Sequence, residues 1–118
     1  MMQPAVEPAR SSRVDLLFHA LGDSNRRCIV SRLADGPASV LELGAVLAVS
    51  KRAIGQHLAV LEEAQLARST KAGRVRTCQF DPAGLEPLQG WIDYHRQESN
   101  ERLNRLGDLV SATVSKEG

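Results

Sequence analysis

Apolar residues recur along this chain at helical spacing, in short segments that turn-forming residues separate. The clearest segment has apolar positions four and three residues apart, the spacing of one buried helical face: Ile54, Leu58 and Leu61. It follows Ser50, a residue type that favours the N-cap of a helix. A shorter apolar segment before it opens with Ser39 and Glu42, which have the spacing of a capping box. Residues 40–65 are therefore predicted to form two short helices joined by a tight turn at Ala48-Val49.

After this helix pair the pattern changes to two strand-like runs, residues 66–70 and 75–80. They flank Lys71-Ala72-Gly73-Arg74, a turn in which glycine adopts a positive φ at little cost. A hairpin attached directly to a helix-turn-helix makes a winged helix. The predicted fold class is therefore mainly α with a small β-hairpin wing, comprising about five helices and two strands.

Two helices are predicted before this region. Residues 14–21 form a short apolar helix, and Asp23 or Ser24 caps a second helix that ends at Asp35-Gly36-Pro37. We interpret Arg26 and Arg27 in the second helix as residues that form ion pairs or cap helices, rather than as DNA contacts. His57 is expected to pack or hydrogen-bond at the back of the later helix, away from DNA.

The chain ends in a long predicted helix. Asp81 as N-cap and Pro82 at the next position start a first turn, and Pro87 indicates that the long helix begins near Glu86. Its stripe at spacings of three and four is apolar at the ends and polar in the middle: Leu85, Leu88, Ile92, His95, Ser99, Arg102, Leu106 and Leu109. So long a helix has too little partner surface within one protomer. We therefore expect a homodimer, whose interface contains Leu17, Leu88, Trp91, Ile92, His95 and Leu106.

Basic side chains are concentrated on the predicted helix-turn-helix and wing. The whole chain has a net charge of +1. Residues 51–79 have six basic and two acidic side chains, a net charge of +4, whereas residues 80–118 have four basic and seven acidic ones, a net charge of −3. A solvated charged surface is the alternative to phosphate contacts. We expect contacts to double-stranded DNA from eight residues of the second helix and the wing: Ser50, Lys51, Arg52, Gly55, Gln56, Lys71, Arg74 and Arg76.

Composition excludes several classes of function. Aromatic residues are 3% of the chain, too few to form a stacking platform for single-stranded nucleic acid. No apolar run approaches the ~20 residues that span a bilayer, and the first twelve residues lack the apolar region of a signal peptide, so no membrane association is expected. Cys28 and Cys78 lack metal or redox spacing, which indicates a reducing, cytoplasmic location. Scattered histidines and the lack of a nucleophile motif argue against an enzyme.

These segments together resemble the ArsR/SmtB family of dimeric winged-helix repressors. The likeness begins with FHALGDSNRR at 18–27, includes the capped helix pair, and continues with HLAVLEEAQL at 57–66, GRVR at 73–76 and FDPAGL at 80–85. It covers about residues 16–109. It implies a dimeric repressor. A two-fold dimer would place two recognition helices about 34 Å apart, so the expected operator is an imperfect inverted repeat.

The resemblance also raises metal sensing, because many members of the family sense metals. One family site places cysteine thiolates on the helix that here spans residues 40–46, which contain no cysteine. The other uses an Asp-x-His, which Asp93 and His95 match, but Leu106 and Leu109 stand where its remaining ligands would lie. The resemblance therefore implies a regulator without the usual metal sites, and we expect no metal and no cofactor.

Three alternatives stay open at this point. A symmetric metal site at the dimer interface would use Asp93, His95 and Glu98. Redox sensing would use Cys28 or Cys78, provided that a thiol pKa is lowered. A winged-helix protein-interaction module would not need the basic face that this sequence retains.

The predicted domain organisation is a flexible tail at 1–12, one DNA-binding and dimerisation domain at 13–110, and a C-terminal tail at 111–118. Gly55 stands where the family often has serine, within the predicted recognition helix. Glycine costs a helix about 1 kcal/mol but permits close approach to DNA.

Overall fold

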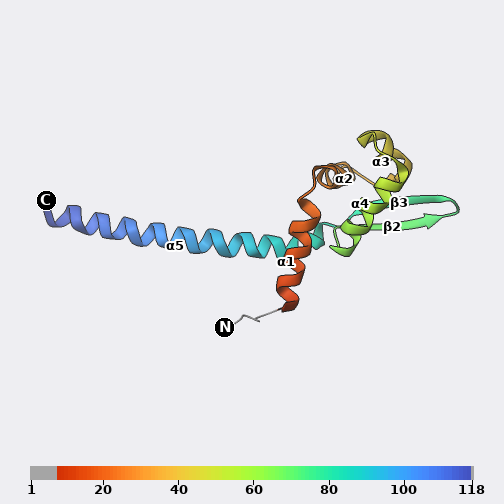
Figure 1. The fold of residues 1–118 in the computed structure, drawn as a ribbon. Helices are drawn as coiled ribbons and strands as arrows, with labels where there is room; N and C mark the ends of the chain where they lie inside the picture. The colour runs from red at the N-terminus through yellow and green to blue at the C-terminus, as the bar shows by residue number, and fades with distance from the viewer. Residues whose placement is uncertain (1–7, 118) are drawn as a thin grey trace. The chain divides into compact units, whose positions relative to one another are not determined.

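Five α-helices, one 3-10 turn and a three-stranded sheet make up residues 8–117, the part of the chain that the computed structural model describes, with side chains described for residues 13–112. In chain order (Figure 1) the elements are α1 (Pro8–Leu21), α2 (Ser24–Ala34), β1 (Ala38–Ser39), α3 (Val40–Leu47), α4 (Lys51–Glu63), β2 (Ala67–Ala72), β3 (Val75–Phe80), η1 (Pro82–Leu85) and α5 (Glu86–Glu117). The chain divides into two units between Pro87 and Leu88. The first unit is a winged helix-turn-helix, which confirms the predicted fold class.

The first unit packs α1 to α4 and the sheet around an aliphatic core. The largest side chains in it are fully buried: Leu17, Ile29, Leu43, Ile54, Leu58, Leu61 and Leu66. The predicted stripe of α4 is therefore its buried face, and each of these side chains contributes about 1.5–3 kcal/mol to folding. Leu17 corrects one expectation. It was assigned to the dimer interface, but it has no exposed surface and belongs to the protomer core.

Side-chain caps define where three helices begin. The Ser39 Oγ accepts from the Glu42 N–H at 3.0 Å while the Glu42 Oε1 accepts from the Ser39 N–H at 2.8 Å, so the predicted capping box of α3 is present. The Ser50 Oγ accepts from the Ala53 N–H at 3.1 Å and caps α4. Asp23, rather than Ser24, caps α2. The predicted start of the recognition helix is thus confirmed.

Two of these caps shift the pKa of their carboxyl groups. The backbone N–H of Arg26 donates to the Asp23 carboxylate, and this hydrogen bond is the main reason that the pKa of Asp23 lies below its ordinary value. The backbone N–H of Ser39 lowers the pKa of Glu42 in the same way. Both carboxylates are stabilised in the charged form by the folded backbone.

The sheet has the strand order β1-β3-β2 and is antiparallel throughout. The hairpin was predicted, but β1 was not. Its two residues pair with the middle of β3, Ala38 with Cys78 and Ser39 with Thr77. β1 leads directly into α3, so this third strand attaches the start of the helix-turn-helix to the wing.

The hairpin turn is tighter than expected. Strand pairing continues to Ala72 and Val75, which leaves Gly73 and Arg74 as a two-residue loop in place of the predicted four-residue turn. Gly73 has a φ of 63°, and no positive φ occurs at Arg74. A positive φ at the first loop position alone is the pattern of a type II′ turn, which matches the twist of a hairpin. Arg74 therefore lies at the tip of the wing.

The end of α4 is held by a close backbone contact. Gln65 has a φ of 62°, and the Leu66 N–H donates to the Leu61 carbonyl at 2.9 Å, which ends the helix. The backbone of η1 then packs against this point. A Cβ atom at Gly84 would lie 1.9 Å from the Gln65 carbonyl oxygen, so only glycine fits there. This contact sets where the chain leaves the wing.

The arginines of α2 hold the end of α1. The Arg26 Nε donates to the Ala20 carbonyl at 2.8 Å, and the Arg27 Nη1 donates to the Leu21 carbonyl at 2.7 Å. This confirms their interpretation as helix-capping residues. The Arg26 Nη1 also lies 3.4 Å from the His57 Nδ1, which confirms that His57 hydrogen-bonds at the back of α4.

The outer helices are longer than predicted. The first was expected at residues 14–21, but α1 begins at Pro8, so residues 8–12 are helical where a tail was expected. Residues 1–7 of that tail lie outside the described residues. α5 begins at Glu86, as predicted, and continues to Glu117, so residues 111–117 of the expected C-terminal tail are helical. The backbone therefore extends both end helices beyond the predicted domain limits.

Candidate nucleic-acid interface

The N-terminal half of α4 presents a polar face on the side opposite its buried stripe. Ile54 and Leu58 are buried in the core, whereas Gln56 between them is exposed. Lys51, Arg52 and Gln56 are exposed there, and Gly55 is half-buried. The face thus combines two cations, an amide and a position without a side chain. An amide and a guanidinium are the groups that read base edges in a major groove.

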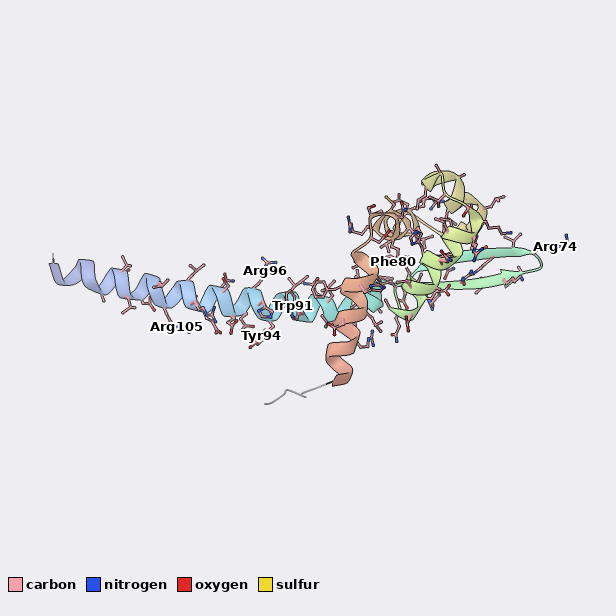
Figure 2. All side chains as sticks on the ribbon, in the orientation of Figure 1. Arg74, Phe80, Trp91, Tyr94, Arg96 and Arg105 are labelled. Carbon is pink, nitrogen blue, oxygen red and sulfur yellow. The ribbon has the colours of Figure 1, made fainter. Side chains whose placement is uncertain are left out.

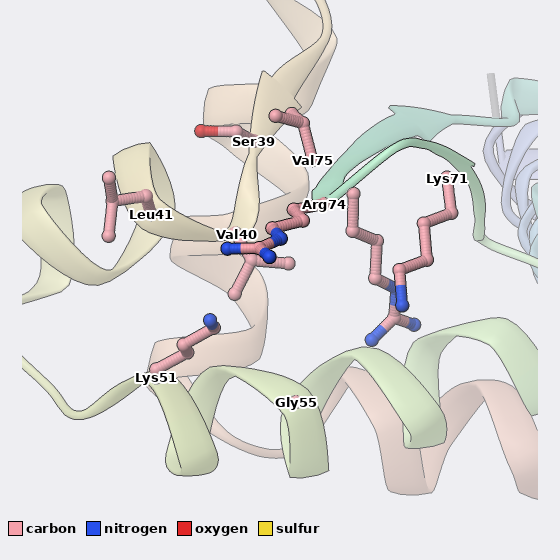
Figure 3. A pocket seen from close by; sticks show the side chains of 9 residues that line it. Ser39, Val40, Leu41, Lys51, Gly55, Lys71, Arg74 and Val75 are labelled. Carbon is pink, nitrogen blue, oxygen red and sulfur yellow. The ribbon is translucent and has the colours of Figure 1, made fainter.

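A groove of about 400 Å³ separates this face from the wing. Figure 3 shows α4 on one side, with Lys51 rising from it, and Lys71 and Arg74 on the wing opposite. The start of α3 forms a third side. The lining residues are Ser39, Val40, Leu41, Lys51, Gly55, Lys71, Arg74, Val75 and Arg76. The groove brings together residues from three segments that are far apart in the sequence.

Five of the eight predicted DNA contacts line this groove: Lys51, Gly55, Lys71, Arg74 and Arg76. The other three, Ser50, Arg52 and Gln56, are exposed on the same helix end but do not line it. Sequence reasoning missed Leu41 and Val75, whose exposed fractions are 75% and 55%. No local pattern marked them, because the groove forms only when α3, α4 and the wing come together.

The cations of this region differ in whether they already have an anionic partner. Arg76 and Glu62 form an ion pair, with 2.9 Å between Nη2 and Oε2. Arg68 lies 3.8 Å from the Asp81 carboxylate. Lys51, Arg52, Lys71 and Arg74 have no ion pair within residues 13–112. Figure 2 shows Arg74 at the far end of the wing. Four cations per protomer are therefore available to an external polyanion.

Cys78 does not have the properties of a redox sensor. Cys78 is fully buried in β3, and burial raises the pKa of its thiol. A raised pKa disfavours the reactive thiolate. Redox sensing through Cys78 would require a lowered thiol pKa, and the pKa of Cys78 is shifted in the opposite direction. Cys28 is exposed on α2, and both cysteines are free thiols. Cys78 acts as a small apolar residue of the sheet.

The Asp93 and His95 side chains each contact another side chain of α5. The Gln89 Nε2 donates to the Asp93 Oδ1 at 2.9 Å, and the His95 Nδ1 lies 3.9 Å from the Glu98 carboxylate. The His95 ring lies against Trp91, with 4.5 Å between the ring centroids. Within the described residues of one protomer, no group of three or more metal-ligating side chains gathers.

Much of the apolar surface that the chain exposes lies on α5. Trp91, Leu103, Leu106, Leu109 and Val110 are between 44% and 65% exposed. Of the predicted interface residues, Leu88 and Ile92 are half-buried and His95 is exposed. No helix in the described part of the chain is long and apolar enough to cross a membrane.

Comparisons with known proteins agree with this geometry. A helix-turn-helix domain family model matches residues 21–70. The HTH-type transcriptional regulator Rv2034 of Mycobacterium tuberculosis is 47% identical over 79 residues, which are 67% of this chain and 74% of that protein. The crystal structure of an ArsR family transcriptional regulator, RHA00566, is 30% identical with a TM-score of 0.71, covering 75% of this chain and 97% of that one.

A third comparison concerns the fold alone. The solution structure of the homodimeric winged helix-turn-helix DNA-binding domain of Mb0332 from Mycobacterium bovis is 18% identical, with a TM-score of 0.64, and covers 85% of this chain and 93% of that one. The relatives are transcriptional regulators and not enzymes. The winged helix, the basic groove and these similarities agree: the chain belongs to the ArsR family of helix-turn-helix, DNA-binding transcriptional regulators.

Proposed function

We propose that the chain acts in the cytoplasm as a homodimeric repressor that binds an inverted-repeat operator in duplex DNA, without a metal ion or other cofactor. The observation that carries the proposal is the basic groove between α4 and the wing. When α4 enters a major groove and the wing reaches the neighbouring minor groove, one sugar-phosphate strand runs between them. Lys51 on one side and Lys71 and Arg74 on the other would contact its phosphates.

Sequence recognition would come from the exposed end of α4. The Arg52 guanidinium suits guanine and the Gln56 amide suits adenine, because each makes two hydrogen bonds to one base edge. Ser50 would contact a phosphate at the helix N-terminus, where backbone N–H groups and the helix dipole favour an anion. Gly55 would let the helix backbone approach the DNA closely.

The exposed apolar residues of α5 support dimerisation. α5 has 32 residues, a length of about 48 Å at 1.5 Å per residue. A second copy of this helix would cover side chains that one protomer leaves exposed, including Leu103, Leu106 and Val110. The fold neighbour from Mycobacterium bovis is itself homodimeric. Two-fold symmetry in the protein requires two half-sites related by the same symmetry in the operator.

Selection of bound sites from random duplex DNA tests this proposal. We expect an inverted repeat whose half-site centres are about one helical turn, 10–10.5 base pairs, apart. Sedimentation of the complex should give two protomers per selected duplex. A reporter gene behind the selected site should be expressed less when the protein is present. Selection of unrelated sequences, or a complex with one protomer, would contradict the proposal.

A further inference from the structure

Three polar side chains from three elements meet at the base of the wing. The Glu62 Oε2 on α4 accepts from the Ser69 Oγ on β2 at 2.6 Å and from the Arg76 Nη2 on β3 at 2.9 Å. The Arg76 Nε donates to the Ser69 Oγ at 3.0 Å. Each member of this Glu62–Ser69–Arg76 cluster therefore contacts both others. Glu62 and Arg76 side chains are only 30% and 34% exposed, which shields their pairing from solvent.

The cluster joins α4 to the hairpin just before the wing tip begins at Thr70. All six residues of the wing tip, from Thr70 to Val75, are exposed. The tip carries Lys71 and Arg74, the wing cations of the groove. The contacts that hold the base of the hairpin therefore also determine where Lys71 and Arg74 lie relative to Lys51.

The strand register gives the cluster a second consequence. Lys71 and Arg76 are direct cross-strand partners, so their side chains leave the same face of the hairpin. Like charges in this relation destabilise a hairpin. The Glu62 carboxylate draws the Arg76 guanidinium into an ion pair and compensates its charge. Lys71 is left as the free cation of the pair.

We propose that Arg76 is a positioning residue rather than a DNA contact, and that the Glu62–Ser69–Arg76 cluster holds the wing at the angle at which Lys71 and Arg74 contact DNA. This inference rests on the proposed DNA-binding function and revises the predicted role of Arg76. It predicts that Glu62 strengthens DNA binding, although its carboxylate has the same sign of charge as the DNA phosphates. Simple charge repulsion would give Glu62 the opposite effect.

Matched variants separate the two effects. Glu62→Gln and Glu63→Gln remove the same charge from neighbouring positions of α4, but Glu63 is exposed and makes no hydrogen bond or ion pair within the described residues. Arg76→Met and Arg74→Met likewise remove one cation each from β3 and from the turn. Ser69→Ala removes one member of the cluster without changing any charge. It replaces Glu62→Gln as the test variant if Glu62→Gln is unfolded at the temperature of the binding assay.

The measurements are titrations of a fluorescent duplex at several salt concentrations, at a temperature where thermal melts show every variant folded. We expect Glu62→Gln and Ser69→Ala to weaken binding about three- to tenfold at an unchanged salt slope. Glu63→Gln should bind as tightly as the wild type or tighter. Arg76→Met should keep the wild-type slope, whereas Arg74→Met should make it shallower by about one unit per protomer. Hydrogen exchange of the wing amides should be faster than in the wild type for Glu62→Gln but not for Glu63→Gln.

Two results would overturn the inference. One is a Glu62→Gln variant that binds as tightly as Glu63→Gln, because the carboxylate would then act only as a repelling charge. The other is an Arg76→Met variant whose slope falls as much as that of Arg74→Met, because Arg76 would then contact a phosphate. If the wild type itself shows no salt-dependent binding to duplex DNA, the proposed function fails instead.

Discussion

Replacing Gly55 by alanine should make the protein more stable and a weaker DNA binder at the same time. Gly55 lies inside α4, and a Cβ atom built there meets no other atom within 4 Å. The substitution therefore introduces no clash in the free protein. Alanine is favoured over glycine within a helix by about 0.5–1 kcal/mol, which raises the melting temperature of a domain of this size by about 2–8 °C.

The same methyl group would stand in the groove that we assign to DNA. Two residues of α4 line the groove, Lys51 and Gly55, and Gly55 has no side chain to fill it. If the helix backbone approaches the DNA closely, the added carbon overpacks that contact. Overpacking typically costs 1–3 kcal/mol, so affinity should fall by about fivefold or more.

Calorimetry of the free protein and anisotropy titration of a fluorescent duplex measure the two effects separately. Gly90→Ala is the matched control, because Gly90 is an exposed glycine in α5 with no atom within 4 Å of a built Cβ. We expect its DNA affinity to equal that of the wild type. A Gly55→Ala protein that is more stable and binds DNA as tightly as the wild type would refute the close approach of α4 at this position.

Three further expectations follow from the same structure. Gln56→Ala and Arg52→Ala should weaken binding to the selected operator more than to random DNA, since two-point base contacts are worth about 1–3 kcal/mol each; equal losses in paired titrations would make them phosphate contacts. Gly84→Ala should unfold at a markedly lower temperature, because its Cβ would collide with the backbone that follows α4; an unchanged melting curve would show that the collision is relieved. Asp23 and Glu42 have pKa values below their ordinary ones in the folded chain, so their contribution to stability is fully present above about pH 5 and is lost as pH falls through the lowered values. Melting temperatures of Asp23→Asn/Glu42→Gln should therefore fall less steeply than those of the wild type between pH 5 and pH 2, and parallel profiles would contradict this origin.

The helix-turn-helix was predictable because its signals are local. A serine hydroxyl at Ser39 or Ser50 caps the helix that follows it within three residues, and the stripe from Ile54 to Leu61 lies on a single helix. The wing was predictable for the same reason, since Gly73 sits between two strand-like runs. Such patterns need no knowledge of what lies elsewhere in the chain.

The features that sequence reasoning missed depend on contacts between distant segments. Ala38-Ser39 is too short to read as a strand and becomes one only by pairing with β3. Arg76 looked like one more cation of a basic segment, because nothing local shows that Glu62 reaches it from α4. Leu17 has the apolar character of an interface residue and of a core residue alike. Its burial decides between them.

The salt dependence of duplex binding by the wild type tests the central claim most directly. Lys51, Lys71 and Arg74 are the groove-lining cations without an ion pair within the described side chains, and a dimer brings two sets of the three. If all six contact phosphates, the slope of log affinity against log salt should be about −5. Arg74→Ala should make that slope shallower by about one unit per protomer without changing the melting temperature. A slope near zero for the wild type, or one that Arg74→Ala leaves unchanged, would contradict DNA binding through the groove between α4 and the wing.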